Sequence, residues 1–267
     1  MIVLAEPTRR SLDRVLAASV AARKRDSLDP LEPRLERLMA TAFRKQARAF
    51  LTGFKRFEPW FPGPRHVFIA ADDIDALFDE AALHTVQVFR HPLDEFTARA
   101  LASGMRAAVA EIGIGPSFTL EHPEAVTFLE TNGAERVTQL NETTRTALRK
   151  IVTQAADEGW GYDKTARAIR KRYKDFSVTR AKNIAVYEVG NAYEHGNMLV
   201  AKELQDAGLV MQKHWLTVGD DRVRPAHRAN QAEGWIPLDD AFQNGSDRPP
   251  TDPKCRCTLQ MRREPTP

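Results

Sequence analysis

The chain has 267 residues, of which 42% are hydrophobic and 28% are charged, and its formal net charge is +3. This balance excludes an intrinsically disordered chain, and the length allows one or two domains with buried cores. No apolar run reaches membrane-spanning length, so we expect no membrane contact. Two cysteines, and a charged start without a secretory signal, predict synthesis in a reducing cytoplasm.

Charged residues are distributed in blocks. Residues 1–60 and 145–182 carry an excess of Lys and Arg, whereas residues 61–144 and 183–267 carry an excess of Asp and Glu. Such blocks indicate separate faces for separate partners. The alternative is that solvated helices simply differ in charge along the chain, and for any single block we favour this alternative.

Residues 1–115 are predicted to form a variable helical region. Apolar residues from Leu31 to Phe54 recur at spacings of three and four, which predicts a long helix with one apolar stripe. A shorter helix around Leu12–Leu16 precedes it, and two more follow near residues 74–88 and 94–112. The apolar stripe could pack on another subunit as easily as on its own chain. We therefore expect the start of the chain to order against a partner.

Residues 116–267 are predicted to form the second region, which is helical to about residue 208. "HPEAVTFLETNG" indicates a short helix with a glycine stop, and "NETTRTALRKIVTQAADEGW" indicates a helix that begins at a polar cap. A short basic helix, "YDKTARAIRKRYKDF", comes next. A long helix follows it and ends at Gly208.

Residues 209–267 contain the clearest strand-like sequence. "LVMQKHWLTV" and "CRCTLQM" alternate apolar and polar residues, and turn residues and prolines lie between them. We therefore predict a mainly α protein that ends in a small α+β module around an antiparallel strand pair.

The most specific motif runs from Trp215 to Cys257. It reads W-L-T-V-G-D-D-R-V-R-P-A-H, then G-W-I-P-L-D-D-A-F, then P-P-T-D-P-K-C-R-C-T. This pattern resembles the phage Mu F-like minor head proteins, also called the phage head morphogenesis family. The resemblance extends upstream and covers roughly residues 120–260. Its motif residues in this chain are Trp215, Asp220, Asp221, Arg222, Arg224, His227, Gly234, Pro250, Pro253, Cys255, Arg256 and Cys257.

The resemblance implies a structural role in a tailed phage or a phage-derived particle. Such a protein would be present in a few copies inside the head, near the portal vertex, and would act in head assembly and in DNA packaging or ejection. The implied partners are the portal protein, the capsid interior and double-stranded DNA. The implied location is the virion head, after assembly in the host cytoplasm.

The two cysteines leave several interpretations open. Residues two apart are badly placed for a disulfide. A zinc site would use both thiols, with further ligands from His227 and from Asp220, Asp221 or Asp252. Many members of the family carry Cys-x-x-Cys where this chain has Arg224 to His227, and often His where it has Asp252. Two of the soft positions of those members are therefore arginine and aspartate in this chain, which argues against a structural metal here.

We favour a structural interpretation of the same residues, without a metal. Arg222, Arg224 and Arg256 would pair with acidic residues, and both cysteines would pack as small hydrophobic side chains. The acidic candidates are Asp239, Asp240 and Asp252. A third interpretation is an enzyme, such as a metal-dependent hydrolase. However, no residue set has a recognisable catalytic spacing, so we predict no catalytic residues.

A basic cluster indicates contact with DNA. Its members are Arg167, Arg170, Lys171, Arg172, Lys174, Arg180 and Lys182. If they face the genome, each neutralised phosphate releases counterions, which gives affinity without sequence preference. We see no motif for reading bases. The alternative functions of this cluster are a solvated helix face and a portal-docking surface.

Overall fold

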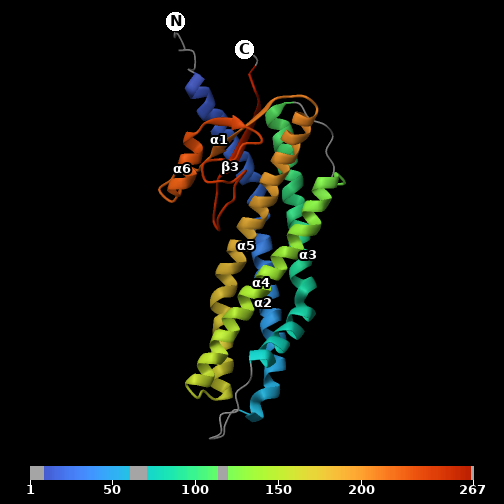
Figure 1. The fold of residues 1–267 in the computed structure, drawn as a ribbon, viewed down its shortest axis with the longest axis vertical. Coiled ribbons are helices and arrows are strands. Elements are labelled where there is room, and N and C mark those ends of the chain that lie inside the picture. Colours follow the sequence, from blue (N-terminus) through green and yellow to red (C-terminus); the bar gives the residue numbers. More distant parts are fainter. Residues whose placement is uncertain (1–8, 61–70, 114–119, 266–267) are drawn as a thin grey trace. The chain divides into compact units, whose positions relative to one another are not determined.

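The structure is a computed structural model that describes residues 9–60, 71–113 and 120–265. The described residues are mainly helical, and their strands form one three-stranded antiparallel sheet (Figure 1), which confirms the predicted fold class. The elements in chain order are α1 (Arg9–Leu28), α2 (Glu32–Phe54), the 3-10 helix η1 (Lys55–Trp60), α3 (Ala71–Ile112), α4 (Pro123–Asp157), α5 (Tyr162–Asp206), β1 (Met211–Leu216), α6 (Pro225–Ala232), β2 (Trp235–Pro237) and β3 (Thr258–Arg263).

The chain divides into two compact units, each built from separate segments. Unit 1 comprises Met1–Glu32, Phe96–Thr127 and Val186–Pro267, and unit 2 comprises Pro33–Glu95 and Phe128–Ala185. Helices α3, α4 and α5 each contribute to both units. The predicted boundary between residues 115 and 116 lies outside the described residues, and each unit draws on sequence from both sides of it.

Unit 2 has an aromatic core that buries the apolar stripe of α2. Phe43 and Phe50 are fully buried, and their rings lie 5.0 Å from Phe89 and 6.5 Å from Phe78, respectively. Both of these neighbours belong to α3. A helix of the same chain therefore covers this stripe, which favours the alternative of packing within the chain. That the start of the chain orders against a partner stays a prediction.

The acidic and basic blocks of the sequence meet within unit 2. Arg145 of α4 pairs with Asp79 of α3, and Arg149 pairs with Asp75. The hydrogen bond from Arg149 lowers the pKa of Asp75, and burial opposes this effect. Part of the charge alternation along the sequence therefore reflects pairing between neighbouring helices rather than external partners.

Helix α3 is continuous, although two helices were predicted in this part of the chain. Pro92 lies inside it and removes one main-chain hydrogen bond. Phe89, Leu93 and Phe96 on either side of Pro92 are buried to within 1% exposure. Burial of these side chains outweighs the lost hydrogen bond, so the helix runs through the proline.

Helices α4 and α5 are also continuous where shorter helices were predicted. In α4 the expected stop, Gly133, has a packing function instead. A Cβ atom at this position would lie 2.2 Å from Asp94 Oδ1 and 3.0 Å from Arg90 Nε. In α5, Ser177 is buried within the helix and donates a hydrogen bond to the carbonyl of Lys174. The predicted end of the long helix is confirmed, since α5 ends two residues before Gly208, whose φ is +95°.

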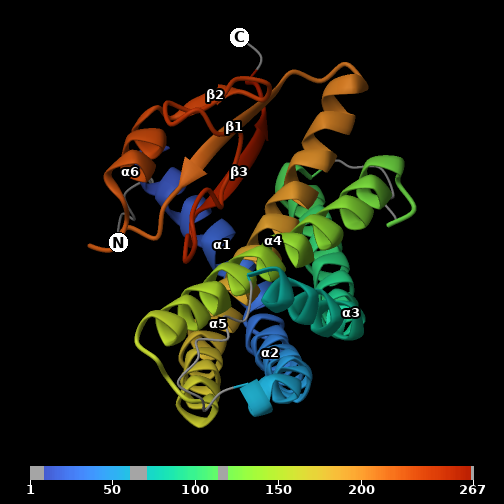
Figure 2. The ribbon, with the colours of Figure 1, turned by 60° about the horizontal axis from the view of Figure 1, so that its bottom comes forward.

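The sheet of unit 1 confirms the predicted antiparallel strand pair. Its strand order is β2-β1-β3 (Figure 2). Trp215 of β1 pairs in register with Leu259 of β3. Strand β2 and helix α6 lie in the loop between the two predicted strands and were not predicted. Both are short, three and eight residues respectively, so they show little periodicity in the sequence.

Two glycines allow α3 and α5 to approach closely within unit 1. A Cβ atom at Gly104 would lie 1.9 Å from the carbonyl oxygen of Tyr193. A Cβ atom at Gly196 would lie 2.3 Å from the carbonyl oxygen of Leu101. Each helix therefore places a glycine against the other's backbone, which holds the part of α5 that supports the sheet.

Candidate metal centre

Local backbone structure brings His227 to the two thiols. Pro225 begins α6, a position where proline fits because the first helical N–H groups have no helical acceptor. His227 therefore lies in the first turn of this helix. A turn precedes the two cysteines. In this turn the Cys255 amide donates to the Asp252 carbonyl (3.2 Å), and Lys254 has a φ of 65°. Gly234, with a φ of +77°, ends α6 before β2.

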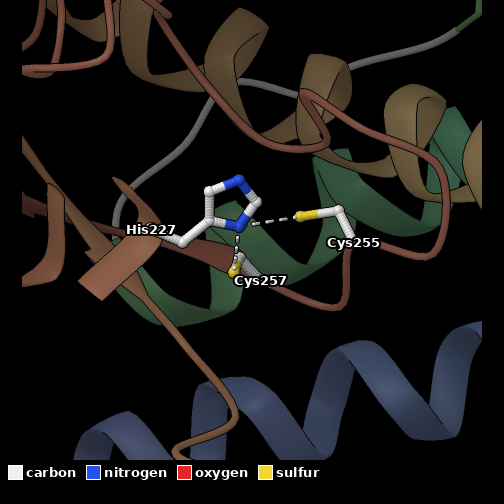
Figure 3. Close-up of side chains that lie close together, drawn as sticks. All are labelled: His227, Cys255 and Cys257. Carbon is white, nitrogen blue, oxygen red and sulfur yellow. Dashed lines mark hydrogen bonds between the residues drawn. The ribbon is translucent and has the colours of Figure 1, made fainter. Parts of the chain in front are cut away.

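The three side chains converge in the interior of unit 1 (Figure 3). His227 Nδ1 lies 3.4 Å from Cys257 Sγ and 3.7 Å from Cys255 Sγ. The three potential ligand atoms lie within 4.8 Å of one another, and all three residues are buried. Cys255 and Cys257 precede β3, yet they point to the same side as expected, while Arg256 between them is exposed.

The second ring nitrogen of His227 is held by polar groups. Nε2 lies 3.0 Å from Thr251 Oγ1 and 3.2 Å from Asp252 Oδ2. A carboxylate accepts only, so the neutral ring donates Nε2–H and keeps its lone pair on Nδ1, which faces the sulfurs. Asp252 therefore contacts the ring from behind and does not join the three converging atoms.

The two thiols differ in acidity. A hydrogen bond from Cys257 lowers the pKa of Cys255 to about 6, although burial opposes this effect. The same hydrogen bond, together with burial, raises the pKa of Cys257. Of the two thiols, Cys255 is therefore the one that ionises first.

A buried ion pair lies directly beneath this site. Lys24 Nζ of α1 donates to Glu194 Oε1 (2.7 Å) and to the carbonyl oxygen of Cys257 (2.6 Å). Glu194 Oε2 of α5 accepts from the backbone amide of Leu259 (3.1 Å) and from Asn197 Nδ2 (3.0 Å). The pair thus fixes the backbone that carries Cys257. Sequence reasoning missed it, because Lys24 and Glu194 lie 170 residues apart.

The three arginines of the motif form ion pairs with acidic residues, as expected, but only Arg224 pairs with one of the residues predicted for it. Arg224 lies 3.9 Å from Asp252 and donates to the carbonyl of Pro253 (3.0 Å). Arg222 and Arg256 both pair with Asp220, at 3.1 and 2.7 Å, instead of the acidic residues expected. The hydrogen bond from Arg256 is the main reason that the pKa of Asp220 is lowered.

The remaining motif residues support the site from outside. Asp221 contributes its carbonyl oxygen, which accepts from Arg228 at 3.2 Å. Trp215 is fully buried and its ring lies 5.3 Å from His227. Pro250 is buried in the turn before Cys255. The motif is therefore a compact structure in which most polar groups bind one another.

The predicted basic cluster on α5 is mostly, but not entirely, exposed. Arg180 is the exception, because its guanidinium lies over the Phe43 ring at 4.9 Å and donates to Thr144 Oγ1 and to the Leu140 carbonyl. Burial lowers its pKa to about 10. Arg180 is thus part of the interior of unit 2 and not a contact for DNA. The exposed members are Arg167, Arg170, Lys171, Arg172, Lys174 and Lys182.

Comparison with known proteins identifies one family. Residues 146–260 match the family described as Phage Mu protein F like protein, which confirms the resemblance found in the motif. The matched segment contains α5 and the three residues of the candidate metal centre. No curated protein and no solved structure matches the chain. Among the described helices, none combines the length and apolar character needed to span a bilayer.

Proposed function

We propose that this chain, whose residues 146–260 are a phage Mu protein F like region, is a minor structural component of a tailed-phage head. The family suggests head morphogenesis, and this match is the observation that carries the proposal. The finer role that we propose is attachment inside the head at the portal, with action in DNA packaging or ejection.

The geometry of the module supports a structural rather than a catalytic role. Its histidine and three of its arginines pair with Asp220 or Asp252, and its thiols are buried. A catalytic group needs access to a substrate at a distance near 3 Å. We therefore propose that the C-terminal module is a rigid attachment unit without enzymatic activity.

The proposal is tested by assembly with the portal protein of the same phage. The two proteins are co-expressed with a tag on the portal protein only, and we expect them to co-purify at a fixed ratio. Heads assembled without this chain should retain less DNA. Normal heads and no association with the portal protein would contradict the proposal.

A second function, non-specific binding of DNA, is favoured by the exposed basic face of α5. Arg167, Lys171 and Lys174 follow one another at helical spacings of four and three, so they share one side of the helix. Lys171 is partly neutralised by Asp175, at 3.0 Å. Such a face binds phosphates by charge, and its affinity falls as salt rises.

A further inference from the structure

We propose that His227, Cys255 and Cys257 bind one thiophilic divalent cation, with zinc as the natural candidate. The proposal goes beyond head morphogenesis and does not depend on it. It rests on the positions of three atoms, Nδ1 and two Sγ, and on the groups that orient them.

The distances from His227 Nδ1 to the two sulfurs match the N–S edges of a tetrahedral zinc site. Zinc binds sulfur at about 2.3 Å and nitrogen at about 2.0–2.1 Å, so neighbouring N and S ligands in a tetrahedron lie about 3.5 Å apart. The observed separations from Nδ1 are 3.4 Å to Cys257 and 3.7 Å to Cys255. A cation therefore fits between the three atoms with little movement of the backbone.

The surroundings of His227 are those of a metal ligand. Metal-binding histidines usually donate their second N–H to a carboxylate or another polar oxygen, which fixes the ring and its tautomer. In this chain Asp252 and Thr251 lie at Nε2 and leave Nδ1 to face the thiols.

A divalent cation would allow both thiols to ionise. Without it, two thiolates in a buried site would carry a double negative charge, which is costly to desolvate. The nearby Lys24 is paired with Glu194 and compensates this charge only in part. A divalent cation would neutralise both thiolates and release their protons on binding.

The chain supplies three ligands, and solvent would supply the fourth. Within residues 9–60, 71–113 and 120–265, the cluster contains only His227, Cys255 and Cys257. Binding would connect the first turn of α6 to the segment that enters β3, two points that lie 28 residues apart in the sequence. The cation would thus add a cross-link between α6 and the start of β3 that the strand pairing does not provide.

The test uses the full-length chain and the metals themselves. Protein produced with supplemental zinc is analysed for metal content, and chelator-treated protein is titrated with Co²⁺, whose thiolate complexes give a charge-transfer absorption band near the ultraviolet. We expect one zinc per chain, and one equivalent of Co²⁺ to saturate the band.

Three variants assign the ligands. We expect Cys255→Ser and His227→Ala to lower the bound zinc at least tenfold, and Arg256→Gln, between the two cysteines, to retain it. Circular dichroism shows whether each variant is folded. If a ligand variant does not fold, the rate at which a thiol reagent modifies the wild-type cysteines is compared with and without zinc. We expect at least tenfold protection.

Three results would overturn the proposal. The first is folded wild-type protein that carries no zinc and gives no Co²⁺ band. The second is full zinc retention in both ligand variants, which would place the metal elsewhere. The third is an unchanged rate of thiol modification on addition of zinc. In the first case the site would be a hydrogen-bonded cluster that holds the loops without a metal.

Discussion

Lys24 shows how much a single buried residue can matter in this protein. Its ammonium group binds Glu194 and the carbonyl of Cys257, and its side chain is 10% exposed, whereas that of Glu194 is fully buried. Removing one partner of a buried ion pair leaves the other charge without compensation. The stability of unit 1 should therefore depend strongly on this residue.

We expect Lys24→Met to lower the free energy of unfolding by about 3–5 kcal/mol, since Glu194 would remain charged and buried. Urea unfolding at pH 7 measures this difference. The matched control is Arg25→Met at the neighbouring exposed position, which should change the free energy by less than about 0.5 kcal/mol. Equal effects of the two changes would show that the ion pair adds nothing to stability.

Glu111 predicts a dependence of stability on pH. Burial raises its pKa to about 7, although a hydrogen bond from the Met261 amide at 3.0 Å opposes this effect. The unfolded state loses the proton near pH 4.5 and the folded state near pH 7. The contribution of Glu111 protonation to the free energy of unfolding is thus complete below pH 4.5 and is lost as the pH rises to 7.

We expect Glu111→Gln, which resembles the protonated form, to remove this dependence. At pH 7.5 the variant should be more stable than the wild type by up to about 3 kcal/mol, and at pH 4.5 the two should be equal. Unfolding curves at several pH values test the expectation. A constant difference between the two proteins at all pH values would contradict it.

At the scale of elements, the long helices α3, α4 and α5 were predicted in position but not in length, and α6 was not predicted. Local rules treat Pro92 and Gly133 as breaks, because they consider only neighbours in the sequence. In the structure, buried side chains carry α3 through Pro92, and a close contact with Asp94 requires the glycine in α4. These reasons involve residues distant in sequence, so a single sequence could not reveal them.

Contacts between residues distant in sequence also decide the surroundings of the candidate metal centre. The motif brought His227, Cys255 and Cys257 together correctly, because all three lie in one recognisable stretch. The orientation of Asp252 toward Nε2 and the pairing of Lys24 with Glu194 depend on the tertiary fold. Sequence therefore predicted which side chains meet at the centre, but not the residues that hold them.

Gly104 gives a test at this scale. We expect Gly104→Ala to destabilise the protein by about 3 kcal/mol, because the new methyl group would overlap the Tyr193 carbonyl and force α3 and α5 apart. Thermal unfolding measures the change. Gly161→Ala is the control, since nothing lies within 4 Å of a Cβ atom there. Similar unfolding temperatures for both variants would show that the two helices do not need their close approach.

At the scale of the whole molecule, the basic face of α5 predicts a salt-dependent affinity for DNA. We expect the combined change of Arg167, Lys171 and Lys174 to Glu to weaken binding to duplex DNA at least tenfold and to reduce its dependence on salt. Fluorescence anisotropy at 50 to 200 mM salt provides the measurement.

The control for this prediction changes three exposed basic residues of α2, namely Arg34, Lys45 and Arg48, to Glu. It alters the net charge equally, so weaker binding from this variant alone would place DNA contact on α2. A wild-type affinity that is unchanged by salt would remove the proposal of DNA binding.

The pairing of Lys24 with Glu194 and Cys257 also has a consequence for the order of folding on the ribosome. An early residue must wait for partners that are synthesised more than 150 residues later, whereas unit 2 is complete at residue 185. Nascent chains should therefore bury their aromatic core first and leave α1 without its acidic partner. Premature termination before residue 194 would leave Lys24 without its carboxylate partner, and termination between residues 194 and 257 would leave it without the Cys257 carbonyl.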